Sequence, residues 1–245
     1  MTESVVIVTG GAGGIGAGIV ACLTEAGHQI VVADLPATDV SDAVAVGSLV
    51  EQTVAEFGRI DGLVNNAAIG PLGTVLDTDE ATFDRIFAVN VKGAFLMSQA
   101  VLPHLISAGG GAIVNVGSGA GHGKPNMAAY AASKSALHTL GASMAYDHFH
   151  QHVRVNTVIP GGGGIPTGIS LDRFGGSAAD YAALPHVGSV VGRPVTPNDV
   201  GNVVAFLCSA AAEAISGTVI DVGAMANQGG PLAASVPGRA PMGSA

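Results

Sequence analysis

Short runs of apolar, mostly β-branched residues recur along this chain and alternate with longer segments of helical period. The runs are apolar at consecutive positions, so both faces of the resulting strands would be buried, as in a parallel sheet covered by helices on each side. Six runs are expected to form strands: 5–8, 30–33, 62–64, 112–116, 153–158 and 218–222. Five segments are expected to form helices: near 14–27, 43–57, 79–107, 127–150 and 197–210. This alternation predicts an α/β fold with a doubly wound parallel sheet.

Length and composition favour a single domain that associates with copies of itself. The 245 residues contain no Pro/Ser-rich linker, so 1–228 is expected to form one domain and 229–245 a Gly/Pro/Ala-rich tail. Hydrophobic residues make up 48% and charged residues 11%, so a homo-oligomer is expected to bury apolar helix faces. A net charge of −9 argues against nucleic-acid or anionic-membrane partners.

The cellular compartment is inferred from what the termini and cysteines suggest. The first residues lack the basic start of a signal peptide, and no uninterrupted apolar run approaches the length of a membrane helix. Cys22 and Cys208 are interpreted as free thiols of a reducing environment. A cytoplasmic location is therefore expected.

A glycine-rich turn, residues 9–16, follows the first expected strand and opens the first expected helix. Glycines permit tight backbone angles and a close approach to pyrophosphate, and the free N–H groups of a helix start face an anion. Such a turn in this position predicts dinucleotide binding and a Rossmann-like sheet. The positions expected to contact the cofactor are Gly10, Gly14, Ile15 and Gly16.

An acidic residue at the end of the second strand favours NAD over NADP. Asp34 can accept hydrogen bonds from a ribose 2′-hydroxyl and would repel a 2′-phosphate. The glycine turn also contains no Arg or Lys that could hold such a phosphate.

Tyr130 and Lys134 stand four residues apart in a helical segment, which places both side chains on one face. A tyrosine is a poor base at neutral pH, and a nearby ammonium favours the phenolate. Ser118 ends an upstream strand, where its hydroxyl can hold a substrate oxygen beside the phenol. Asn90 lies inside the long helix 79–107, where its amide is expected to bend the helix and hold a water. Together these residues predict proton transfer coupled to hydride transfer.

In these motifs the chain resembles the single-domain branch of the short-chain dehydrogenase/reductase family. The resemblance extends to about Gly223 and includes the glycine turn, Asn65-Asn66-Ala67 and Pro160-Gly161. It implies that Tyr130 is the general acid/base, that Lys134 lowers its pKa and binds the nicotinamide ribose, and that Ser118 orients the substrate. It further implies that Asn90 holds a water that relays protons to Lys134.

The same resemblance assigns further residues to the cofactor. It implies that Asp39 and Val40 line the adenine pocket, and that Asn66, with Ala67, lies on the adenosine side. The nicotinamide is expected to lie against Pro160, Gly161, Ile165 and Thr167. The resemblance also implies a homotetramer or homodimer, and it implies no metal.

The chain departs from the family pattern beside the adenosine end. Only four residues separate Asp34 from Asp39, too few for a helix and a strand. We therefore expect the usual outer third strand and its helix to be missing, which leaves the Asp34 strand at the sheet edge. A second departure is the run Gly161–Gly164, which is expected to be mobile without cofactor.

The expected reaction interconverts a secondary alcohol and a ketone with NAD. The segment 168–191, expected to cover the substrate, is largely apolar and contains no cluster of Arg or Lys, which favours a small, fairly apolar substrate. His122 and His186 are candidate substrate contacts, whereas His148, His150 and His152 lack the spacing of metal ligands. Two alternatives stay open: a ketoacyl carrier-protein reductase, and a catalytically silent nucleotide-binding subunit.

Overall fold

A computed structural model describes residues 4–161, 165–182 and 193–225 of the chain. Within these ranges, six parallel strands form one sheet in the order β2-β1-β3-β4-β5-β6. The strands are β1 (Val5–Thr9), β2 (Gln29–Ala33), β3 (Gly62–Asn65), β4 (Gly111–Val116), β5 (Val153–Pro160) and β6 (Val219–Val222). The strand order reverses between β1 and β3, as in doubly wound sheets, so the predicted fold class is confirmed.

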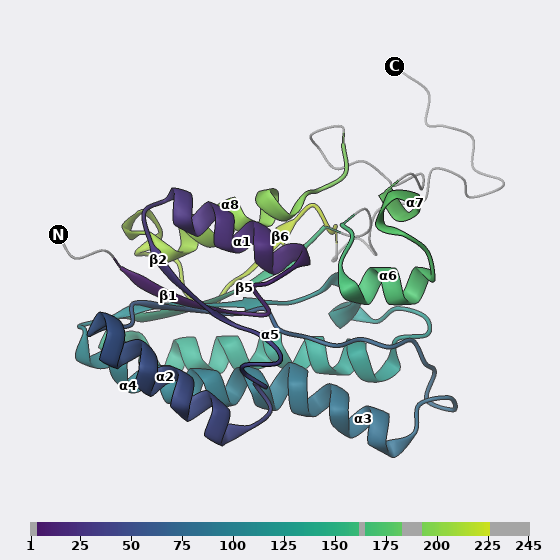
Figure 1. Ribbon diagram of the computed structural model, residues 1–245, viewed down its shortest axis with the longest axis horizontal. Helices are drawn as coiled ribbons and strands as arrows, with labels where there is room; N and C mark the ends of the chain where they lie inside the picture. The colour runs from purple at the N-terminus through teal and green to yellow at the C-terminus, as the bar shows by residue number, and fades with distance from the viewer. Residues whose placement is uncertain (1–3, 162–164, 183–192, 226–245) are drawn as a thin grey trace.

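Helices cover both faces of the sheet (Figure 1). The helices on one face are α1 (Gly14–Glu25) and α8 (Pro197–Cys208). Those on the other are α2 (Ala43–Phe57), α4 (Ala94–Ser107) and α5 (Ala128–His148). Each face encloses its own apolar core, one containing Ile19 and Val204 and the other Val50 and Met97.

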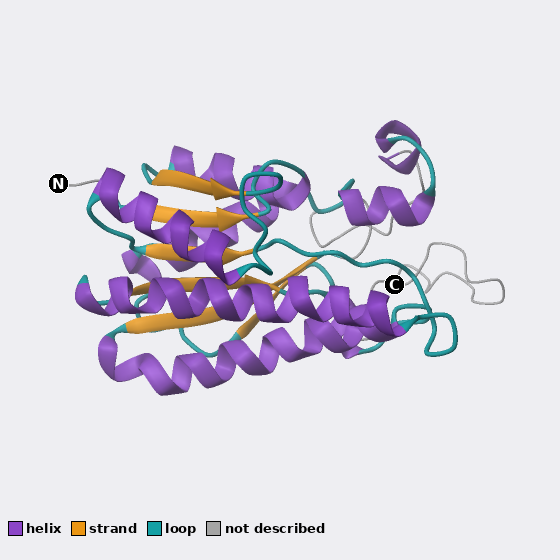
Figure 2. Cartoon of the chain, turned by 60° about the horizontal axis from the view of Figure 1, so that its bottom comes forward, coloured by secondary structure: helices purple, strands orange, loops and turns teal. Residues whose placement is uncertain are grey.

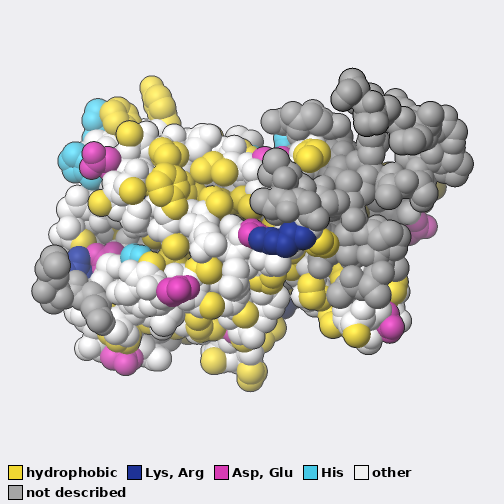
Figure 3. Space-filling view, turned by 90° about the horizontal axis from the view of Figure 1, so that it is seen from above, with side chains coloured by type: hydrophobic (Ala, Val, Ile, Leu, Met, Phe, Trp, Pro, Cys, Tyr) yellow, Lys and Arg dark blue, Asp and Glu magenta, His cyan; other side chains and the backbone are white. Residues whose placement is uncertain are grey.

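Helices α1 and α8 pack with their backbones almost in contact. A Cβ on Gly201 would lie 2.5 Å from the carbonyl oxygen of Gly18, and a Cβ on Gly18 would overlap Pro197. This close approach holds the amino end of α1 against the sheet. In the view from above, this face of the molecule displays scattered hydrophobic side chains and few charged ones (Figure 3).

The expected loss of the outer strand is confirmed. Residues 34–42 form turns and contain no strand, and α2 begins directly after them at Ala43. Asp42 caps this helix, its carboxylate accepting from the backbone N–H of Val44 at 2.9 Å. In the described part of the chain, β2 is therefore an edge strand with β1 as its neighbour.

The long helix expected over 79–107 is divided in three. It consists of α3 (Glu80–Phe87), a π-helical turn η1 (Ala88–Gly93) and α4. A π-helical turn widens the backbone locally and often marks a functional site, and this one contains Asn90. The run Glu80–Ser107 is long and apolar enough to cross a membrane by length and composition, but here α4 packs on β3 and β4.

The carboxyl ends of the strands point toward two short helices, α6 (Gly168–Phe174) and α7 (Ala178–Ala182), which lie beyond the sheet (Figures 1 and 2). These helices belong to the segment expected to cover the substrate. Three sequence-based predictions lie outside the described residues: the mobility of 162–164, the contact by His186, and the tail 229–245. Self-association stays a prediction.

Candidate active site

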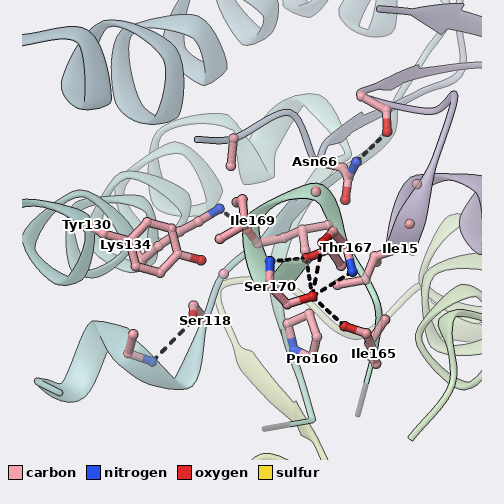
Figure 4. A pocket seen from close by; sticks show the side chains of 18 of the residues that line it. Ile15, Asn66, Ser118, Tyr130, Lys134, Pro160, Ile165, Thr167, Ile169 and Ser170 are labelled. Atoms are coloured by element: carbon pink, nitrogen blue, oxygen red, sulfur yellow. Dashed lines mark hydrogen bonds between the residues drawn. The ribbon is translucent and has the colours of Figure 1, made fainter. Parts of the chain in front are cut away.

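A cavity of about 690 Å³ opens at the carboxyl ends of the strands. Its wall combines the glycine turn after β1, the ends of β3 and β4, the start of α5, and α6 (Figure 4). Ligands of open α/β sheets bind at this edge, where the strand order reverses. Apart from Asp39, Val40 and Asn90, the site residues predicted from the sequence all line this one cavity.

The glycine turn is built so that no side chain fills it. Gly10 has φ +64°, and a Cβ there would lie 2.9 Å from the Cα of Ala67. A Cβ on Gly16 would overlap the carbonyl oxygen of Gly10. At the start of α1, Gly13 provides no side-chain cap and the first turn contains no acidic residue. The first N–H groups of the helix are thus open toward an anion.

Asn66 ties this turn to the next strand. Its side-chain amide donates to the carbonyl oxygens of Thr9 and Gly10 at 2.9 and 2.8 Å. The preceding Asn65 points into the core instead, where it donates to Asn115 and Ser98. Asn66 therefore shapes the cofactor turn, and both Asn66 and Ala67 line the cavity.

Asp34 lies at the end of β2 and lines the same cavity. One carboxylate oxygen accepts from the backbone N–H of Ala12 at 2.9 Å, and the other accepts from that of Leu35 at 2.8 Å. These contacts orient the carboxylate beside the glycine turn, and each oxygen retains the capacity to accept another hydrogen bond.

Asp39 and Val40 do not line the cavity. Asp39 accepts from Ser41 and forms an ion pair with Arg85, and these hydrogen bonds lower the pKa of its carboxyl. Val40 is buried in the core beside Gly93. Both side chains therefore contact other parts of the protein and not the cavity. Their role at the adenine stays a prediction.

The cavity wall also contains Pro160, Gly161, Ile165 and Thr167, and Thr167 lies directly beside Gly14 of the glycine turn. Thr167 caps α6 by accepting from the N–H of Ser170 at 3.0 Å, which positions that helix over the cavity. The glycine turn and the uncapped helix start together fit the pyrophosphate of a dinucleotide.

The phenol of Tyr130 projects into the cavity from α5 (Figure 4). Tyr130 is 7% exposed. Burial raises the pKa of Tyr130, while a hydrogen bond with Ser118 and the positive charge of Arg173 lower it. Ser118 also accepts from the N–H of Ala120 at 3.1 Å, which orients its hydroxyl at the end of β4. Ser118 and Tyr130 thus both line the cavity, and the predicted role of Ser118 in holding the substrate oxygen stays a prediction.

Lys134 lies one turn further along α5 and is 2% exposed. Its ammonium donates to the carbonyl oxygen of Val116 at 2.8 Å and lies 6.0 Å from the centre of the Tyr130 ring. Burial lowers the pKa of Lys134 from 10.5 to about 8. A buried cation of this kind destabilises the folded protein, so its position indicates a functional requirement.

Asn90 uses its side chain to join η1 to two other segments. The amide donates to the carbonyl oxygen of Ile69 and to the Ser133 hydroxyl, and its oxygen accepts from the N–H of Ile69. These contacts hold the loop after β3 against α5. A water-holding role for Asn90 stays a prediction.

Two cationic side chains of the cavity wall were not predicted from the sequence. Arg173 of α6 and Lys124 of the loop before α5 both line the cavity, although the sequence showed no basic cluster. Arg173 is the single basic residue in 168–191, and an isolated charge on a short helix ordinarily faces solvent. The packing of α6 onto the Tyr130 region turns it inward. His122, by contrast, is exposed and does not line the cavity.

Known proteins share this arrangement over nearly the whole chain. Residues 10–224 match the family model described as enoyl-(acyl carrier protein) reductase. The chain is 34% identical to 2-(S)-hydroxypropyl-CoM dehydrogenase 3 of Xanthobacter autotrophicus, over 91% of this chain and 96% of that protein. It is 33% identical to cis-4-hydroxycyclohexanecarboxylate dehydrogenase of Sinomonas cyclohexanicum, over 90% and 95% of the two chains.

A solved structure confirms the fold. The chain is similar to 3-ketoacyl-(acyl-carrier-protein) reductase from Brucella melitensis, crystallised with NADH, with a TM-score of 0.78 and 27% identity. The match covers 91% of this chain and 98% of that one. With the glycine turn, Ser118, Tyr130 and Lys134 all meeting at one cavity, the protein is an oxidoreductase of the short-chain dehydrogenase/reductase family.

Proposed function

We propose that this protein interconverts a secondary alcohol and a ketone using NAD(H). The observation that carries the proposal is the buried Tyr130 phenol, which shares one cavity with the Ser118 hydroxyl and lies close to the Lys134 ammonium. A positioned phenol with an adjacent hydroxyl and a nearby cation is suited to exchange a proton with an alcohol or carbonyl oxygen.

Each residue contributes a separate part of the reaction. Ser118 donates a hydrogen bond to the substrate oxygen and holds it beside Tyr130. Tyr130 gives a proton to that oxygen during ketone reduction and takes it back during alcohol oxidation. Lys134 stabilises the phenolate through its positive charge. Pro160 and Gly161 would hold a nicotinamide, which would supply or accept the hydride.

The cavity wall favours a compact substrate with an apolar body. Its described apolar side chains beside the reacting groups are those of Met127, Ile169, Phe174 and Tyr181. Phe174 and Tyr181 pack edge to face with ring centres 5.6 Å apart, which gives α6 and α7 a shared apolar surface. The relatives named as hydroxypropyl-CoM and hydroxycyclohexanecarboxylate dehydrogenases support a hydroxyl group as the reacting centre.

A panel of secondary alcohols and ketones tests the proposal. We expect NADH to form from NAD with at least one small cyclic alcohol, and the rate to rise with pH because burial raises the pKa of the Tyr130 phenol. The measurement is NADH absorbance, with a β-ketoacyl thioester as a separate arm. Turnover of the thioester alone would favour the carrier-protein reductase. A complete lack of turnover, with NAD still bound, would favour the catalytically silent alternative.

Asp34 is expected to set the preference for NAD over NADP. Replacing Asp34 with Ser removes the carboxylate that would repel a 2′-phosphate, so the ratio of kcat/KM for NAD to that for NADP should fall by about 10-fold or more, equal to about 1.4 kcal/mol. Glu51 on α2 is an exposed acid outside the cavity wall, so Glu51→Gln is a control with the same charge change. An unchanged ratio in Asp34→Ser would contradict this assignment.

A further inference from the structure

Arg173 reaches from α6 across the cavity to the Tyr130 ring. Its guanidinium carbon lies 4.6 Å from the ring centre, and its Nε donates to the carbonyl oxygen of Gly70 at 2.8 Å. Gly70 is required for this approach, since a Cβ there would lie 2.6 Å from the Nη2 nitrogen of Arg173 and 2.7 Å from the Tyr130 ring. The guanidinium is therefore held beside the residue that performs proton transfer.

One end of this guanidinium lacks a partner. The Nη2 nitrogen of Arg173 is buried and has no hydrogen-bond acceptor among the described residues, and none of their carboxylates forms an ion pair with Arg173. Burial lowers the pKa of Arg173, an effect opposed by Tyr130 and Tyr181. Buried donors in charged groups normally have acceptors, because leaving one unsatisfied costs free energy. The stacking on Tyr130 offsets a part of that cost, as cation–π contacts do.

The charges along the cavity are divided between its two ends. The described charged residues of its wall are Asp34, at the adenosine end, and Lys124, Lys134 and Arg173, toward the reacting end. Lys134 donates to the carbonyl oxygen of Val116, whereas Lys124 is an exposed side chain at the rim. No described carboxylate lines the reacting end. This half of the cavity thus presents positive charge that the protein itself does not neutralise.

We propose that the substrate carries an acid group, a carboxylate or a sulfonate, and that Arg173 binds it while Tyr130 and Ser118 hold the reacting oxygen. The inference rests on the function proposed above and narrows its substrate class to hydroxy or oxo acids with an apolar body. Arginine suits this role because its planar donors match oxyanions. Since Arg173 lies against the Tyr130 ring, the acid group is separated from the reacting carbon by a short chain or a single ring.

Matched acid and amide substrates test the proposal in turnover. The panel pairs secondary alcohols bearing a carboxylate or sulfonate with the corresponding primary amides. We expect the acids to be preferred in kcat/KM on the order of 10²-fold or more, since a site that binds a polar group discriminates against analogues lacking it. Arg173→Gln should abolish that preference by lowering kcat/KM for the acids far more than for the amides, and Arg173→Lys should restore part of it.

The control is Arg59→Gln, which makes the same change in charge. Arg59 forms an ion pair with Asp61 near the amino end of β3, whereas the cavity opens at the carboxyl ends of the strands. Arg59→Gln should keep the preference for acids. The proposal is overturned if wild-type protein accepts amides as well as acids. It is also overturned if Arg173→Gln lowers both substrate types equally, because Arg173 would then act only on Tyr130 or on the position of α6.

A binding measurement separates failure of this inference from failure of the proposed reaction. Benzoate, benzenesulfonate and benzamide need no turnover, and their binding is measured by the shift in melting temperature with and without NAD. We expect both anions to raise the melting temperature of wild-type and Arg59→Gln protein, with benzamide inactive and Arg173→Gln unresponsive. This result supports the anion site even if no alcohol is oxidised. Equal responses of the wild-type and Arg173→Gln proteins would overturn it even if neutral alcohols are oxidised.

Discussion

Replacing Tyr130 with phenylalanine is expected to lower kcat by about 10²- to 10⁴-fold, the usual contribution of a positioned general acid/base. The substitution removes one oxygen from a side chain that is 7% exposed and leaves its ring in place. The stacking of Arg173 on that ring should therefore persist, and NADH should bind with nearly unchanged affinity. The measurement combines turnover with NADH fluorescence titration.

Tyr146 provides a matched control on the same helix. It is 79% exposed and lies away from the cavity wall, so Tyr146→Phe should keep full activity. A Tyr130→Phe protein that retains wild-type kcat would contradict the proposed proton transfer. Loss of NADH binding in that variant would indicate instead that the phenol acts mainly in holding the cofactor.

Replacing Lys134 with methionine is expected to abolish activity and to stabilise the fold at neutral pH. Burial lowers the pKa of Lys134 from 10.5 to about 8, so the ammonium costs the folded state about 3 kcal/mol. Methionine removes that cost but leaves the carbonyl oxygen of Val116 without its donor, a loss of about 1–2 kcal/mol. The net gain of about 1–2 kcal/mol corresponds to a melting temperature higher by about 2–8 °C.

The pH dependence of this stabilisation identifies its cause. Because the pKa of Lys134 is lower in the folded than in the unfolded protein, the cost is fully present below about pH 8 and disappears as the pH rises toward 10.5. The melting-temperature difference between wild type and Lys134→Met should therefore shrink over this range. Lys92→Met, which alters an exposed lysine, should show no such gain. A Lys134→Met protein that is less stable at every pH would contradict the expected cost.

The elements of the fold follow closely from local sequence. Valine-rich runs apolar at consecutive positions became parallel strands, which are buried in the middle of the sheet and partly exposed at its edges, in β2 and β6. The four residues between Asp34 and Asp39 were enough to predict the missing outer strand. The sequence predicted a bend at Asn90 but not its π-helical form, because that turn depends on the contacts of Asn90 with Ile69 and Ser133. Those partners come from separate parts of the chain.

The placement of the proposed proton-transfer residues at one cavity was predictable because their relation is local. Tyr130 and Lys134 are one helical turn apart, and Ser118 and Asn66 follow strands whose carboxyl ends share one sheet edge. Asp39 and Val40 show the limit of this approach, since their distance from the cavity depends on how the shortened segment turns into α2.

The sequence by itself determined the sheet, the glycine-rich turn and the pair Tyr130–Lys134. Hydrophobic periodicity, glycine spacing and the ends of strands are all set by residues that lie close together in the chain. Only the tertiary structure revealed the positive charge at the end of the cavity near Tyr130. Arg173 meets the carbonyl of Gly70, 103 residues earlier, and the ring of Tyr130 through the docking of α6. No local pattern encodes that contact, because the side chain's environment arises from three segments that only folding brings together.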